Sequence, residues 1–191
     1  MPKPNLLFLY TDEQAAATMA AYGNSLIETP NLDRLASQSI VFEQAYVSQA
    51  VCTPSRSTIL TGLYPHESGC TKNNVPLLEE VKCLPELGDF SDYRTAHFGK
   101  WHLGDEIFPQ HGFQEWVSIE DEYRGYYGPG RDRNAHCDYH EWLVERGFDP
   151  QESHDGFKFF PRSYCARLPE QFGKPAYLAD QASRFIRENM G

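Results

Sequence analysis

The most constraining feature of this 191-residue sequence is an unbroken apolar run over residues 5–10, which reads Asn-Leu-Leu-Phe-Leu-Tyr. A continuous run of this length is typical of a strand that is buried on both faces in an α/β sheet. The run leads directly into Asp12 and Glu13, so two carboxylates are predicted at the carboxyl end of a central strand. That edge is where ligands bind in open α/β sheets.

Strands and helices are predicted to alternate through the first hundred residues. A helix is expected to begin at Thr29-Pro30, and a second strand is expected over 40–47. A further helix is expected to follow Cys52 and to end at Gly62. A helical stretch over 84–90 and a third strand over 94–98 come next. This order predicts an α/β core over residues 3–104 of one domain, 1–191. Turn-forming and charged residues predict a loop-rich excursion from about 105 to 175 with a short helix at 140–146, and a periodic apolar pattern predicts a last helix over 176–190.

Charge and composition exclude several classes of protein. The chain carries 17 Lys and Arg against 27 Asp and Glu, a formal net charge of −10, which argues against nucleic-acid binding. No apolar stretch approaches the roughly 18 residues that a membrane span needs, so no membrane association is expected. The first residues lack a signal-peptide cleavage site, and five irregularly spaced cysteines do not form a disulfide framework. These features favour a cytoplasmic location.

The segment over residues 50–62 carries the most chemical information. Pro54 and Ser55 suit the first turn of a helix, which places the Cys52 side chain at the positive end of the helix dipole, where an anion binds favourably. Arg56 lies one turn further on, within reach of the same anion. Taken alone, the pattern equally describes a capped helix with a small buried cysteine and a surface arginine.

Three further groups of residues allow a functional and a structural interpretation. Asp12 and Glu13 offer the oxygen ligands that calcium or magnesium prefers, but acidic pairs at strand ends are often solvated loop residues. Lys100 and His102 follow Gly99 as a basic pair, either in a site or at a solvated strand end. His136 and His140 have zinc-like spacing, yet without further ligands in the motif they favour a loop that runs into a helix.

Two blocks of the sequence together resemble a known family. The run over 50–62, with Cys-Thr-Pro-Ser-Arg at its centre, resembles the first signature of the type I sulfatases, and the run over 93–102, Tyr-Arg-Thr-Ala-His-Phe-Gly-Lys-Trp-His, resembles the second. Asp92 stands where the family usually has glycine, a departure that affects a turn and not the chemistry. The strand that ends in Asp12 and Glu13, the Thr-Pro-Asn-Leu-Asp-Arg-Leu-Ala helix and His-Gly-Phe at 111–113 follow the family's order. The resemblance is close over 3–104 and loose beyond.

The resemblance implies a fold and a set of site residues. The fold is an alkaline phosphatase-like α/β/α sandwich with a largely parallel central sheet, of which this chain is the N-terminal part, incomplete at the C-terminus. In the family, the cysteine that matches Cys52 is oxidised to formylglycine, whose hydrated aldehyde is the nucleophile. The matching metal ligands are Asp12, Glu13 and Cys52, for a divalent cation, usually Ca²⁺, with Mg²⁺ or Mn²⁺ as alternatives. Glu13 departs from the family's more usual aspartate, which makes it the least certain ligand.

The same resemblance assigns roles to three cationic residues. Arg56 matches the arginine that holds the formylglycine hydrate, Lys100 matches a lysine that bridges the hydrate and the sulfate, and His102 matches a histidine bonded to the second hydroxyl. The three are expected to converge near Cys52. A proton acceptor at His102 and positive charge on the transferring group are what sulfate transfer requires.

The implied function is hydrolysis of a sulfate ester on a small molecule or carbohydrate, with a formylglycine-generating or sulfatase-maturating enzyme as partner. The alternatives are a formylglycine-dependent phosphodiesterase or phosphonate monoester hydrolase, and a non-catalytic remnant that only binds sulfated ligands. The family draws further metal ligands and sulfate-binding residues from C-terminal positions that have no convincing match here. We therefore expect the 191 residues alone to show no turnover.

Overall fold

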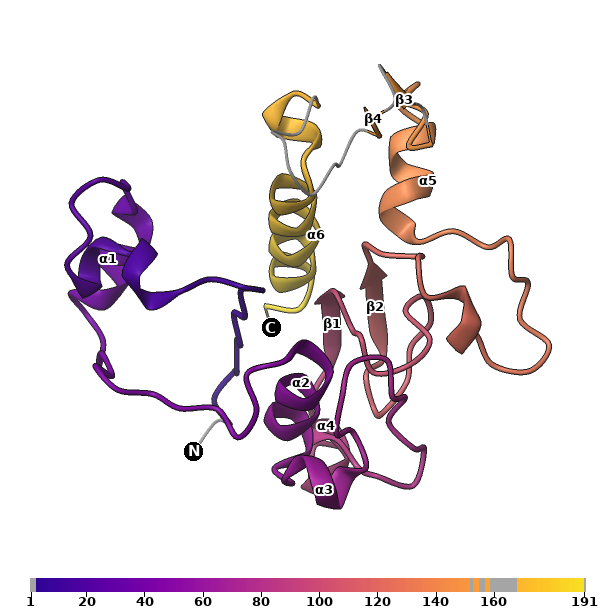
Figure 1. Cartoon of the computed structure of the whole chain (residues 1–191), viewed down its shortest axis with the longest axis horizontal. Helices are drawn as coiled ribbons and strands as arrows, with labels where there is room; N and C mark the ends of the chain where they lie inside the picture. The colour runs from indigo at the N-terminus through magenta and orange to yellow at the C-terminus, as the bar shows by residue number, and fades with distance from the viewer. Residues whose placement is uncertain (1–2, 152, 155–156, 159–167, 191) are drawn as a thin grey trace. The chain divides into compact units, whose positions relative to one another are not determined.

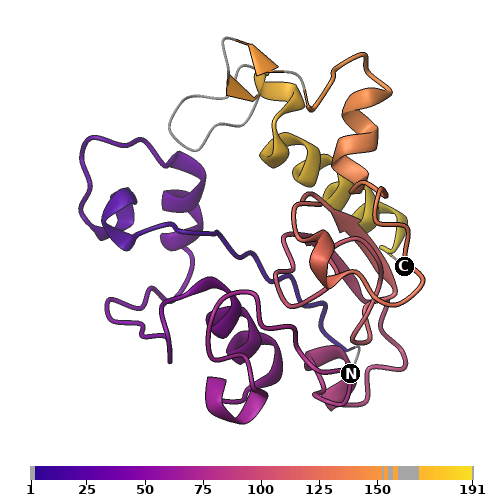
Figure 2. The ribbon, with the colours of Figure 1, turned by 45° about the vertical axis from the view of Figure 1, so that its right-hand side comes forward.

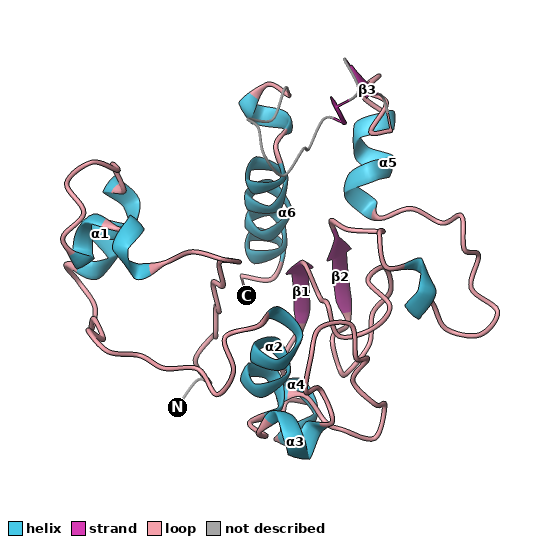
Figure 3. Cartoon of the chain, viewed as in Figure 1, coloured by secondary structure: helices cyan, strands magenta, loops and turns pink. Residues whose placement is uncertain are grey.

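The computed structural model describes residues 3–151, 153–154, 157–158 and 168–190 (Figure 1). The chain divides into two compact units, residues 1–47 and 48–191, and each is described by itself. Helices and short strands alternate with long connecting segments (Figure 3). Among the described residues, no helix has both the length and the apolar character needed to cross a bilayer.

The first unit contains short helical elements. Two 3-10 helices, η1 (Ala16–Thr18) and η2 (Ala20–Tyr22), precede the helix α1 (Pro30–Ala36). Pro30 occupies the first turn of α1, as predicted, because its missing N–H group has no helical acceptor there. The Thr29 hydroxyl donates to Asp33 Oδ1 at 3.0 Å and accepts from the Ala20 amide at 3.1 Å, which ties η2 to α1.

The structure differs from the prediction of strands over 5–10 and 40–47. Neither segment forms a strand, and the side chains of Leu6, Phe8 and Leu9 are 71%, 62% and 72% exposed. A strand exists only where a neighbouring strand pairs with its backbone, and the described part of residues 1–47 offers no such neighbour. An apolar sequence pattern therefore identifies a segment suited to burial without supplying its pairing partner.

The second unit holds the remaining elements. In chain order they are α2 (Cys52–Thr61), α3 (Pro65–Ser68), α4 (Leu84–Leu87), β1 (Ala96–Gly99), β2 (Glu115–Ser118), η3 (Arg124–Tyr126), α5 (Asp138–Val144), β3 (Ser153–His154), β4 (Phe157–Lys158), η4 (Glu170–Phe172) and α6 (Lys174–Glu188). The structure confirms three of the predicted elements, with each boundary within two residues. They are the helix that follows Cys52, the strand before Gly99 and the last helix.

A parallel pair of strands lies at the centre of this unit. β1 and β2 pair from Ala96 with Glu115 to Gly99 with Ser118. Helix α6 runs alongside β1, and α5 packs against β2, so helices accompany the parallel strands (Figures 1 and 2). β2 lies in the segment that the sequence indicated to be loop-rich, because its four residues give too short a pattern to separate from a loop.

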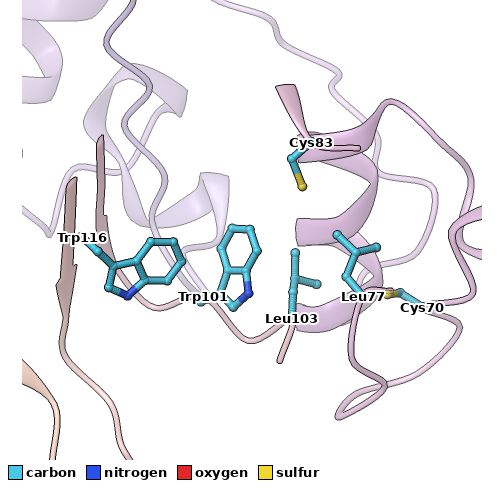
Figure 4. Packing of buried hydrophobic residues seen from close by; sticks show 6 residues of the cluster. All are labelled: Cys70, Leu77, Cys83, Trp101, Leu103 and Trp116. Carbon is cyan, nitrogen blue, oxygen red and sulfur yellow. The ribbon is translucent and has the colours of Figure 1, made fainter. Parts of the chain in front are cut away.

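A cluster of buried apolar side chains anchors the segment that follows β1. It consists of Cys70, Leu77, Cys83, Trp101, Leu103 and Trp116 (Figure 4). Trp101 and Leu103 are each 1% exposed, and the Trp101 and Trp116 rings meet edge to face with centroids 5.2 Å apart. Because these two residues are fixed in the core, the backbone that carries Lys100 and His102 is fixed with them.

Candidate functional site

Helix α2 begins at Cys52, the residue that the resemblance to the type I sulfatases marks as the nucleophile position. Val51 is extended, with φ −136° and ψ 144°, and Cys52 is the first helical residue. The helix ends at Gly62, whose φ of 72° is the left-handed conformation that glycine adopts readily. The first turn is largely buried, and Cys52 itself is half-buried, so its side chain stands at the edge of a packed region.

Side chains of α2 hold the segment 100–102 through its carbonyl groups. The Thr53 hydroxyl donates to the carbonyl oxygen of His102 at 2.9 Å, and Arg56 Nη1 donates to the carbonyl oxygen of Lys100 at 2.7 Å. Thr53 is fully buried and Arg56 is 8% exposed, so both bonds lie away from bulk water. Residues far apart in the sequence are thereby brought to one place.

His102 has an unusual backbone conformation and a fixed ring. Its φ is 59°, and Asn74, with φ 63°, shares the left-handed region, which costs free energy in residues other than glycine. The two side chains meet at 2.8 Å between His102 Nε2 and Asn74 Oδ1, and the imidazole stacks on Tyr123 with centroids 4.6 Å apart. With an oxygen as the acceptor at Nε2, the neutral ring carries its hydrogen there and its basic nitrogen is Nδ1.

Lys100 faces an acidic side chain. Its Nζ lies 3.9 Å from one carboxylate oxygen of Glu120, and Lys174 Nζ lies 3.8 Å from the other. The Lys100 side chain is only 15% exposed, so its charge is less screened than that of a surface lysine. One carboxylate thus lies between two ammonium groups.

Glu106 is a fully buried acid of this region. Its two carboxylate oxygens accept from the Trp101 amide at 2.9 Å and from the His102 amide at 2.6 Å, while its own carbonyl accepts from Trp116 Nε1 at 2.7 Å. Burial raises the pKa of Glu106 to about 7, an effect that Glu120 reinforces and that the two amide bonds and Arg56 oppose. The group therefore titrates near neutral pH.

The predicted site residues are divided between the two units, each of which is described by itself. Arg56, Lys100 and His102 are joined in the second unit by the bonds given above, together with Cys52 at the start of α2. The predicted metal ligands Asp12 and Glu13 are exposed residues of the first unit. Their roles, like those of the cationic residues, stay predictions.

Sequence reasoning missed the residues that support the site. Asn74, Glu106 and Glu120 contact Lys100 or His102 or the backbone between them. None of the three belongs to a recognisable motif, and Glu106 and Glu120 lie in a segment with a loop-like composition. The only available signal was the acidic residue four positions after His102, which is too common a spacing to single out.

A second group of possible metal ligands contains Asp121, His136 and His140, whose ligand atoms lie within 4.8 Å of one another. Asp121 Oδ2 already accepts from His136 Nδ1 at 2.6 Å, and Arg124 Nη2 lies 3.1 Å from the same nitrogen. The two imidazoles stack nearly parallel, with centroids 3.6 Å apart, and a metal lies in the plane of each ring that it binds. Stacked rings and the arginine charge oppose a shared cation, which favours the interpretation of a loop that leads into α5.

A third group, Cys83, Glu86 and His111, belongs to the start of α4. Glu86 Oε2 accepts from the Cys83 amide at 2.9 Å and lies 3.3 Å from His111 Nδ1. Burial, reinforced by the Glu86 charge, raises the pKa of Cys83 to about 12, so its sulfur is a thiol here. Cys83 and Glu86 form a capping box at the start of this helix.

The raised pKa of Glu106 predicts a pH-dependent stability. Below pH 4.5 the group is protonated in both the folded and unfolded states, and as pH rises to about 7 only the unfolded state releases its proton freely, so folding loses stability. A Glu106→Gln variant lacks this loss. Its free energy of unfolding, relative to the parent, should rise by about 3 kcal/mol between pH 4.5 and pH 7 in denaturant titrations. A difference that does not change with pH would contradict the burial of an ionisable group here.

Comparisons with known proteins cover most of the chain. A family model described as "Sulfatase" matches residues 4–189. An N-acetylglucosamine-6-O-sulfatase of Bacteroides thetaiotaomicron is 35% identical over 186 residues, which cover 91% of this chain and 32% of the relative. The chain thus spans about a third of the length of this curated relative.

Two solved structures extend the comparison to the fold. A protein in complex with its substrate D-glucosamine-2-N,6-O-disulfate is 40% identical, with a TM-score of 0.55 over 60% of this chain and 23% of its own. The phosphonate monoester hydrolase of Agrobacterium radiobacter is 20% identical, with a TM-score of 0.65 over 92% of this chain and 36% of its own. These likenesses confirm the predicted α/β class and alkaline phosphatase-like fold. With a family model that covers nearly all of its residues, the chain belongs to the sulfatase family.

Proposed function

We propose that the full-length enzyme hydrolyses sulfate esters, with Cys52 as the position of the nucleophile after its oxidation to formylglycine. The observation that carries this proposal is the pair of hydrogen bonds from Thr53 and Arg56 to the carbonyl groups of His102 and Lys100. They place the two sequence blocks that resemble the sulfatase signatures against each other. A maturation enzyme that converts the cysteine is then a required partner.

The proposed substrate is a sulfated carbohydrate. This choice is supported by the name of the Bacteroides relative, an N-acetylglucosamine-6-O-sulfatase, and by the disulfated glucosamine bound to one of the similar solved structures.

The donor chemistry of Asp12 and Glu13 fits a hard divalent cation. Both side chains supply carboxylate oxygens, the ligand type that Ca²⁺ and Mg²⁺ prefer, whereas the thiol of unmodified Cys52 does not suit such a metal. Ca²⁺ takes 6–8 oxygen ligands, so the proposed pair would be part of a larger set. When bound, such a cation lowers the pKa of an oxygen nucleophile and screens negative charge.

The cationic residues have distinct parts in the proposed reaction. Arg56 is proposed to hold the oxygens of the formylglycine hydrate at the start of α2, because the fork of a guanidinium group suits paired oxygen acceptors. Lys100 Nζ offers a positive charge to the sulfuryl group as charge moves onto its oxygens. His102 is the proposed proton acceptor, and the contact between its Nε2 and the Asn74 oxygen holds the ring.

Sulfate and phosphate specificity are distinguished by a direct comparison of substrates. The full-length, matured enzyme should turn over an aryl sulfate with a higher kcat/KM than an aryl phosphate diester or an aryl phosphonate monoester. Cys52→Ala should abolish turnover and leave the fold intact, because a methyl group cannot attack sulfur. A higher kcat/KM on the phosphorus substrates would favour the phosphodiesterase alternative, and a matured enzyme without turnover on any of them would favour the non-catalytic alternative.

A second prediction concerns Lys100. Lys100→Ala should lower kcat by about 10²–10³-fold, as for the loss of one group that stabilises transition-state charge. The matched control is Lys82→Ala, which removes the same charge from an exposed position and should change kcat by less than about twofold. Equal effects of the two substitutions would show that Lys100 acts only through net charge.

A further inference from the structure

The carboxylate of Glu106 has the geometry of a clamp on the segment that carries Lys100 and His102. Glu106 is fully buried, and its two oxygens accept separately from two consecutive main-chain amides, those of Trp101 and His102. Its own main chain is anchored as well, because its carbonyl accepts from the Trp116 indole on β2. The clamp therefore joins the central strands to the segment 100–102.

The clamped segment has a conformation that needs such support. Gly99 has φ 123° and His102 has φ 59°, so the chain turns sharply after β1 and turns again at the histidine. A left-handed histidine costs free energy, and such conformations persist only where surrounding contacts over-determine them. Two charge-assisted bonds from one buried carboxylate are contacts of that kind.

A carboxylate is the side-chain group that fits these two donors. Each of its oxygens faces one N–H group, at 2.9 Å and 2.6 Å. A glutamine at this position would keep one acceptor oxygen but would turn an NH₂ group toward the other amide, donor against donor. The substitution is otherwise nearly isosteric, and it also removes the unfavourable burial of a charge.

We infer that Glu106 is a positioning residue for the hydrolysis proposed above, which holds the backbone at Trp101 and His102 and so sets the direction in which Lys100 and His102 present their side chains. The inference rests on the proposed function. Thr53 and Arg56 hold the carbonyl groups of this segment, and Glu106 holds its amide groups from another direction. Without the two amide bonds, Lys100 and His102 are still present, but their side chains no longer point in the direction that the reaction needs.

The test uses the full-length, matured enzyme and two neighbouring variants. Glu106→Gln should lower kcat on an aryl sulfate by about 10- to 100-fold, with KM within about threefold of the parent, because misplaced groups lose transition-state contacts. Its thermal midpoint at pH 8 should not fall, since the lost bond is offset by the removal of a buried charge. The matched control is Asp105→Asn, a buried carboxylate that pairs with Arg131 at 3.2 Å and does not contact Trp101 or His102.

The control should show the opposite pattern. Asp105→Asn should lower the thermal midpoint and leave kcat within about threefold of the parent, because it weakens an ion pair outside the clamp. If Glu106→Gln leaves kcat within twofold of the parent, or loses activity only in proportion to a lowered thermal midpoint, Glu106 is a structural residue and the inference is wrong.

Hydrogen exchange separates this inference from the proposed function. In Glu106→Gln, the amides of Trp101 and His102 should exchange at least about tenfold faster than in the parent, whereas Asp105→Asn should leave them unchanged. Unchanged exchange in Glu106→Gln would overturn the clamp whatever the activity. If the matured parent shows no sulfatase turnover while exchange behaves as expected, the proposed function fails, and with it the catalytic part of the inference, but the clamp itself stands.

Discussion

The two hydrogen bonds from buried side chains of α2 to the carbonyl oxygens of Lys100 and His102 are the contacts on which the rest of the site depends. A buried backbone group must find a partner, and here the carbonyl groups of the segment face α2 while its amide groups face Glu106. Side chains thus satisfy both polar groups of the peptide unit between Lys100 and Trp101. The segment can therefore adopt a turn that neither a helix nor a strand would stabilise.

Packing against the core fixes the same segment by a different force. Trp101 and Leu103 are almost completely buried, and they alternate with Lys100 and His102 along the chain. Large apolar side chains on both sides of His102 make any shift of the segment costly, because it would expose or displace an indole ring. The segment over residues 100–103 thus contributes side chains both to the hydrophobic core and to the polar site.

Local sequence signals were sufficient to predict several helices, but they did not predict the elements that depend on contacts between distant segments. Pro30, Gly62 and the periodic pattern before Asn189 correctly predicted helices and their ends. The strand β2, of four residues, and the lack of strands over 5–10 and 40–47 depend on which backbone segments meet, and a local sequence pattern does not show that. At the site, the signature residues were recognisable by resemblance, whereas Glu106 and Asn74 are defined only by their contacts.

The central claim is that Cys52 is the site of a formylglycine, and the most direct test is the mass of the peptide that contains it. Trypsin releases residues 35–56 as one peptide, because cleavage follows Arg34 and Arg56. In active enzyme isolated from its native host, this peptide should carry an aldehyde at Cys52 and should react with a hydrazide probe. An unmodified thiol at Cys52 throughout a preparation with full sulfatase turnover would contradict the account.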